Sequence, residues 1–180
     1  MPEKIISFEL ETDLLMALEN LSSSLKKIKN GRDSYLKWAF IFGHTALQST
    51  MCLSLITTSS FLVRNKSFYQ EDAGDLDNIE WLYQKLQKPE FLPYTGSKII
   101  PKNELNQIKN IQKIRNTFIH QQPDLYIFTF KELFDFIILM VRLIRFLVSQ
   151  SERMSFGGNV NKKCFEDWLD TLENQLRVCL

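Results

Sequence analysis

The feature that most limits what this chain can fold into is a run of 26 residues without a formal charge, from Trp38 to Val63. A run of this length is long enough for a helix that crosses a bilayer, so a membrane span competes with a buried helix. The hydrogen-bonding side chains within the run are His44, Thr45, Gln48, Ser49, Thr50, Ser54, Thr57, Thr58, Ser59 and Ser60. So many polar groups favour a long helix buried in protein, and no membrane association is expected.

The other apolar residues recur every three or four positions, which is the spacing of an amphipathic helix. This spacing predicts helices over residues 5–28, from Ile79 onward, over 101–120, over 130–148 and over 162–180, with a Ser/Gly-rich linker at 149–161. The helix over 130–148 is apolar nearly all round, which predicts that it is central. The low glycine count of 6 disfavours sandwiches and barrels of short strands. The 180 residues are therefore predicted to form one all-α domain, a bundle of about five to six helices.

Two helix ends carry recognisable capping residues. Asn30 and Gly31 follow the first apolar stripe, where a left-handed residue can close a helix. The carboxylates of Asp75 and Asp77 come just before Ile79, where an acidic side chain favours a helix N-terminus. We therefore expect Asp75 or Asp77 to cap the helix that begins near Ile79.

Charge and cysteine content narrow the classes of function. The formal net charge is +1, whereas a protein that holds nucleic acid through many phosphate contacts usually has a strong basic excess. Any RNA is therefore expected to be bound locally. Cys52, Cys164 and Cys179 lie far apart without metal-ligand spacing, which predicts reduced thiols rather than a disulfide framework or a zinc site. Neither a metal nor a cofactor is expected. The N-terminal residues lack the layout of a signal peptide, so a cytoplasmic protein is expected.

One short motif, Arg115-Asn116-Thr117-Phe118-Ile119-His120, carries the residue types that acid–base and phosphate chemistry need. Histidine is the natural proton carrier near neutral pH. On a continuous helix Asn116 and His120 share a face, but Arg115 and His120 point about 140° apart. Pro123 favours fraying of the helix near His120. Either that fraying or a second subunit would bring Arg115 and His120 together.

The motif resembles the Arg-x4-His signature of HEPN domains, which are all-helical modules of prokaryotic toxin–antitoxin, phage-defence and RNA-processing systems. The order of segments is also similar: a long helix containing His44 and Gln48, a variable loop, a helix ending in the motif, and a strongly apolar helix. The resemblance covers roughly residues 35–148. It implies an HEPN-like bundle, a homodimer and, in active members, RNA cleavage without a metal. It also implies that an antitoxin or other protein partner is possible.

Carried onto this chain, the resemblance implies a role for each residue of the motif. His120 would handle the proton of the attacking 2′-hydroxyl or of the leaving oxygen. Arg115 would hold the phosphate and stabilise the charge that develops on it. Asn116 would orient the phosphate or His120.

Alternatives to catalysis remain open for these residues. The motif could serve a noncatalytic HEPN-like module that binds RNA, a nucleotide or a protein, or a histidine at a helix end could simply cap carbonyl groups. His44 and Gln48, four residues apart on one helical face, could line the same cleft as His120. Otherwise they form a polar pair that is hydrogen-bonded inside the bundle.

Overall fold

The structure is a computed structural model that describes residues 9–56, 58, 60–63, 76–91, 100–120, 127–150 and 162–179. The elements in these ranges are all helices, so the prediction of an all-α bundle is confirmed. The six α-helices are α1 Leu10–Lys29, α2 Leu36–Ile56, α3 Ile79–Leu86, α4 Leu105–His120, α5 Phe130–Ser149 and α6 Lys162–Cys179. Short 3-10 turns are η1 Asp33–Tyr35, η2 Ser60–Val63, η4 Pro89–Phe91 and η5 Lys102–Glu104.

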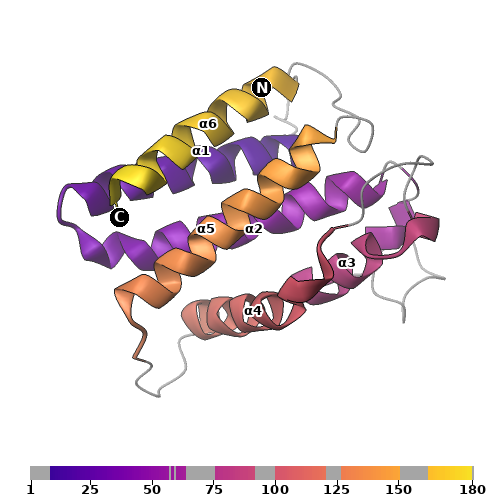
Figure 1. Cartoon of the computed structure of the whole chain (residues 1–180), viewed down its shortest axis with the longest axis horizontal. Helices are drawn as coiled ribbons and strands as arrows, with labels where there is room; N and C mark the ends of the chain where they lie inside the picture. Colours follow the sequence, from indigo (N-terminus) through magenta and orange to yellow (C-terminus); the bar gives the residue numbers. More distant parts are fainter. Residues whose placement is uncertain are drawn as a thin grey trace, which may run out of the picture.

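The helices lie side by side around a common core (Figure 1). Helices α1 and α6 pack together along one side, α3 and α4 pack together along the other, and α2 lies between them. Helix α5 crosses over α2 and also contacts α6. This order gives α2 neighbours on several sides, which explains why the helix carries no formal charge after Lys37.

Helices α1 and α2 form an antiparallel pair because the chain reverses sharply after Lys29. Gly31 has φ of 78°, the left-handed conformation that glycine adopts without steric cost, and nothing lies near its missing Cβ. The predicted cap at the end of the first helix is therefore confirmed. The predicted start of this helix at residue 5 lies outside the described residues.

Helix α2 is buried over most of its length despite its hydroxyl groups. Thr50 Oγ1 donates to Ala46 O at 2.7 Å, and Ser54 Oγ donates to Thr50 O at 2.9 Å, so these buried hydroxyls are satisfied within the helix. One described helical stretch, Asp33–Ile56, is long and apolar enough to cross a membrane, and 72% of its most apolar window is buried inside the protein. Core helices of soluble proteins pass the same test, so length and composition alone are weak evidence for a span.

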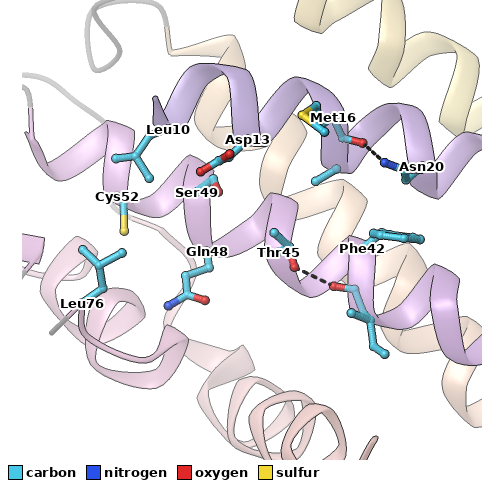
Figure 2. A pocket seen from close by; sticks show the side chains of 12 residues that line it. Leu10, Asp13, Met16, Asn20, Phe42, Thr45, Gln48, Ser49, Cys52 and Leu76 are labelled. Carbon is cyan, nitrogen blue, oxygen red and sulfur yellow. Dashed lines mark hydrogen bonds between the residues drawn. The ribbon is translucent and has the colours of Figure 1, made fainter. Parts of the chain in front are cut away.

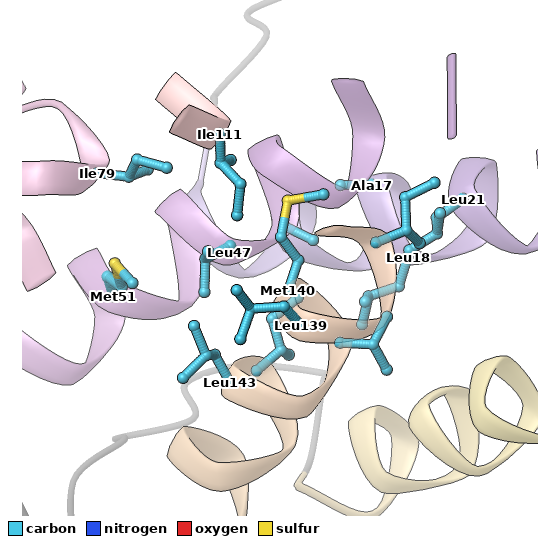
Figure 3. Packing of buried hydrophobic residues seen from close by; sticks show 14 of the residues in the cluster. Ala17, Leu18, Leu21, Leu47, Met51, Ile79, Ile111, Leu139, Met140 and Leu143 are labelled. Atoms are coloured by element: carbon cyan, nitrogen blue, oxygen red, sulfur yellow. The ribbon is translucent and has the colours of Figure 1, made fainter. Parts of the chain in front are cut away.

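Helix α5 supplies the centre of the core, as its apolar sequence predicts. Figure 3 shows Leu139, Met140 and Leu143 of α5 among residues of α1 and α2. The contact with α2 is close: a Cβ built on Gly43 would lie 2.9 Å from the end of the Met140 side chain. Two charged residues in the second half of α5 form ion pairs with other elements: Arg142 pairs with Glu104, and Arg145 donates to Glu173 Oε1 at 2.9 Å. Helix α5 is thereby joined to both η5 and α6.

The start of α3 differs from the prediction. The residue that caps the helix is Asn78, whose Oδ1 accepts a hydrogen bond from the Trp81 backbone at 3.1 Å. Asp77 is instead 5% exposed and forms a buried ion pair with Lys85. Asp75 lies outside the described residues. The prediction that Asp77 caps α3 is wrong because a lysine eight positions along the chain competes for its carboxylate.

Candidate functional site

Helix α4 positions Asn116 and His120 by burying the side of the helix that lies opposite to them. Ile108, Ile111 and Ile114 face the core, while Asn116 and His120 are exposed and Arg115 is partly exposed. The helix continues through His120 without fraying. Successive residues of a continuous helix differ by about 100°, so the side chains of Arg115 and His120 leave it about 140° apart. Of the two ways to unite them, fraying does not occur here.

An aromatic cluster holds the motif end of α4 against α2 and against the residues just before α5. Phe118, inside the motif, meets Phe40 of α2 edge to face, with ring centroids 5.5 Å apart. It meets Phe128, just before α5, in the same way and at the same distance. Lys37 Nζ lies 5.7 Å from the Phe118 ring centroid, so a cation is also present at this end of the helix. The cluster fixes the motif end of α4 to α2 and to the segment just before α5.

Arg115 and Asn116 contact each other and a third polar residue. Arg115 Nη1 donates to Asn116 Oδ1 at 3.2 Å. Gln112 Nε2, from the preceding turn, donates to the same oxygen at 3.0 Å. Among the contacts of the described residues, none joins His120 to Arg115 or Asn116. The structure therefore brings two of the three predicted motif residues together.

Gln112 is the residue that sequence reasoning missed. Its position four residues before Asn116 was a usable signal, since such pairs meet on a helix surface. Its second partner could not be read from spacing, because His44 lies 68 positions away along the chain. His44 Nε2 and Gln112 Oε1 are 3.2 Å apart, so a histidine of α2 reaches the motif helix.

His44 is buried and neutral. Its side chain is 2% exposed, and this burial is the main reason that its pKa falls from 6.5 to about 4. The positive charge of Arg115 lowers the pKa further, while the hydrogen bond to Gln112 acts in the opposite direction. At neutral pH the imidazole is therefore uncharged.

Gln48 lies one turn further along α2 and has a different partner. Its Nε2 donates to the backbone oxygen of Asp77 at 3.0 Å, just before α3 begins. His44 and Gln48 thus share a helical face, as predicted, but each is bonded to a different element. Both hydrogen bonds join α2 to the α3–α4 side of the bundle.

A groove of about 390 Å³ lies between α1 and α2, and Figure 2 shows its lining. Gln48 lines it together with Asp13, Thr45 and other residues of these two helices, whereas no residue of the motif does. Cys52 also borders it, but this thiol is 0% exposed, and burial raises its pKa to about 12. A protonated, enclosed thiol is a poor nucleophile, so the groove offers apolar surface rather than reactive groups.

The described residues contain no group of three His, Cys, Asp or Glu side chains that could hold a metal ion. The polar groups at the motif are instead amide, guanidinium and imidazole groups. Comparison of the chain with protein-family models, with curated proteins and with solved structures finds no match.

Proposed function

We propose that this chain is a metal-independent endoribonuclease of the HEPN type that acts as a homodimer in the cytoplasm. The observation that carries the proposal is the solvent-accessible end of α4, where Asn116 and His120 are exposed and Arg115 is partly exposed. A histidine buried at the helix end would have favoured a purely structural role. Exposure instead leaves the His120 imidazole accessible to a substrate.

The chemistry follows from the residue types at this end of α4. Arg115 presents a guanidinium group, which suits the charge and the planar geometry of a phosphate. His120 can take the proton of the attacking 2′-hydroxyl or give a proton to the oxygen that leaves phosphorus. The 2′-oxygen forms a new bond to phosphorus while the bond to the leaving oxygen breaks. The group that Arg115 stabilises is the phosphate on which negative charge develops.

Helix geometry supports a site built from two copies of the chain. Arg115 and His120 are five residues apart on a continuous helix, so they lie about 7.5 Å apart along the helix axis. Their side chains also point in directions about 140° apart. In a twofold dimer, His120 of one copy can face Arg115 of the other. Each of the two sites would then need both copies.

The direct test is RNA cleavage by the purified protein in the presence of EDTA. We expect Arg115→Ala to lower the cleavage rate about a hundredfold or more. We expect His120→Ala to lower it about a hundred- to ten-thousandfold. Arg177→Ala is the matched control, since it removes an exposed arginine from the distant helix α6 and should leave the rate unchanged. Cleavage that survives both motif substitutions would refute the proposal.

Mixing the two inactive variants tests the shared site. A heterodimer of Arg115→Ala and His120→Ala contains one site with both residues intact and one site with neither. Random exchange of subunits should therefore restore about a quarter of the wild-type rate in a symmetric dimer. If the mixture stays inactive although heterodimers form, each site lies within one copy.

A noncatalytic binding module is the second candidate, and one observation favours it. Arg115 and Asn116 are joined to each other and to Gln112, whereas His120 is not joined to them. Such an arrangement suits binding of RNA, of a nucleotide or of a protein partner such as an antitoxin. Stable binding of RNA or of a co-purifying protein, with no turnover by the wild type, would select this candidate.

A further inference from the structure

A chain of hydrogen bonds runs from the buried core to the exposed motif. It begins at His44 on α2, passes through Gln112 and ends at the side chains of Asn116 and Arg115 on α4. The three links are 3.2, 3.0 and 3.2 Å long. His44 is 2% exposed whereas Asn116 is exposed, so the chain connects a fixed group to a solvent-facing one.

The direction of this chain is set by a backbone amide. The N–H of Ile79, at the start of α3, lies 3.4 Å from Gln112 Oε1 and can only donate. Gln112 must therefore turn its oxygen toward Ile79 and its NH2 group toward Asn116. His44 Nε2 faces the same oxygen, so this nitrogen carries the proton of the neutral imidazole. The orientation of Gln112 thus follows from its neighbours rather than from an arbitrary choice between oxygen and nitrogen.

The orientation of Asn116 follows from that of Gln112. Two donors, Gln112 Nε2 and Arg115 Nη1, converge on Asn116 Oδ1. The oxygen is thereby occupied, and the NH2 group of Asn116 is turned away from both donors. Asn116 and Arg115 then present N–H groups and no acceptor, which is the arrangement that an anionic oxygen requires.

We propose that Gln112, held by His44 and by the Ile79 backbone, is a positioning residue that turns the Asn116 amide so that Asn116 and Arg115 together bind a phosphoryl group. The identity of this group as the phosphate of RNA rests on the function proposed above. The positioning itself rests on the hydrogen bonds alone. A glutamine–asparagine pair on an isolated helix surface stabilises only the helix. Here the pair is attached to two other helices, which gives the motif a fixed orientation.

The test replaces Gln112 in two ways. Gln112→Glu keeps an acceptor for His44 and Ile79 but presents an oxygen to Asn116, so the Asn116 amide must turn round and Arg115 is drawn to the new carboxylate. Gln112→Met keeps the length of the side chain without adding charge, and it serves if the glutamate variant fails to fold. Gln107→Glu is the matched control, because it adds the same charge at an exposed position of the same helix.

The protein is titrated with inorganic phosphate, and NMR monitors the signals of the Asn116 side-chain NH2 and the Arg115 Nε–H at each addition. We expect saturable shifts at both groups in the wild type and in Gln107→Glu. We expect about a tenfold or greater loss of phosphate affinity in both Gln112 variants, as removal of one well-placed hydrogen bond to a charged ligand produces. The Asn116 NH2 signals should also move in these variants before phosphate is added, which a general loss of helix stability would not cause.

Two results would overturn the positioning role. One is phosphate affinity in folded Gln112→Glu and Gln112→Met equal to that of the wild type. The other is the absence of phosphate-dependent shifts at Arg115 and Asn116 in the wild type. A wild type that binds phosphate through these groups, loses it in the Gln112 variants and cleaves no RNA would support the positioning role while refuting the proposed nuclease.

Discussion

Two polar networks begin beside each other at the start of α3 and end in different surroundings. The first contains Asp77 and Lys85, which are both 5% exposed and form an ion pair inside the bundle. Lys85 Nζ also donates to Leu62 O at 2.7 Å. The second begins two residues later, where the Ile79 amide faces Gln112, and it continues to the exposed Asn116.

The difference lies in what each network leaves unsatisfied at the surface. The Asp77–Lys85 pair joins a cation to an anion out of contact with solvent, so it has little left to offer a ligand. In the network through Gln112, two donors converge on Asn116 Oδ1, and the remaining N–H groups of Asn116 and Arg115 point toward solvent. We infer that burial of opposite charges stabilises the fold, whereas a one-directional chain of hydrogen bonds that reaches the surface suits binding.

The largest effect on stability is expected from breaking the buried pair. Lys85→Met leaves the Asp77 carboxylate buried without its cation, which should lower the free energy of unfolding by on the order of 3–5 kcal/mol. Urea unfolding measures this loss, and Lys88→Met, at an exposed position just after α3, is the matched control. The Asn116 side-chain signals should stay unchanged in the folded variant. Their displacement would mean that the two networks are one unit.

A smaller effect is expected from acid, through His44. The fold lowers the pKa of His44 from 6.5 to about 4, so it favours the neutral imidazole. Above pH 6.5 both states are neutral and the contribution of His44 to stability is fully present. Between pH 6.5 and 4 mainly the unfolded state takes up the proton, so the contribution of His44 to stability falls by about 3 kcal/mol across this range.

Comparison with His44→Gln isolates this contribution from that of the carboxylates. The glutamine can still donate to Gln112 but does not titrate, so its free energy of unfolding should fall less between pH 7 and pH 4. Urea unfolding at several pH values measures both proteins. Equal pH dependence in the two proteins would show that His44 is protonated as easily in the fold as in the unfolded chain.

The smallest effect is expected at the residue between the two networks. Asn78→Ala removes the side-chain cap of α3 and should cost about 1 kcal/mol, whereas Asn78→Asp should keep most of the stability. Asn174→Ala, at an exposed position of α6, is the control. Thermal or urea unfolding gives the difference. If the alanine variant also shifts the Asn116 signals, the cap helps to hold Ile79 in place for Gln112.

The helices were predictable because the information for them is local. Leu14, Leu18, Leu21 and Leu25 recur at helical spacing in α1, and all four are 0% exposed. The central place of α5 followed from apolar residues on nearly every face, of which Ile137, Met140 and Ile144 are fully buried. Such patterns can be read from a few neighbouring residues, since burial of one face requires them.

The partners of single polar residues were less predictable. Asp77 was expected to cap α3, but the cap depends on the backbone angles of one residue, and Asn78 has the extended conformation with φ −70° and ψ 165°. The role of Gln112 depends on His44 and on Ile79, which lie 68 and 33 positions away along the chain. No spacing rule connects residues at such separations.

The sequence by itself determined that most of the run from Trp38 would be a buried helix, although that helix ends at Ile56 rather than Val63. It also determined that Arg115, Asn116 and His120 would share the end of another helix. Apolar spacing decides these features because it acts within one element. Only the tertiary structure decided that α2 meets α4 with His44 beside Gln112, and that Asn116 turns its oxygen inward. A hydrogen bond between elements depends on distances of a few tenths of an ångström, and packing of the whole bundle sets those distances.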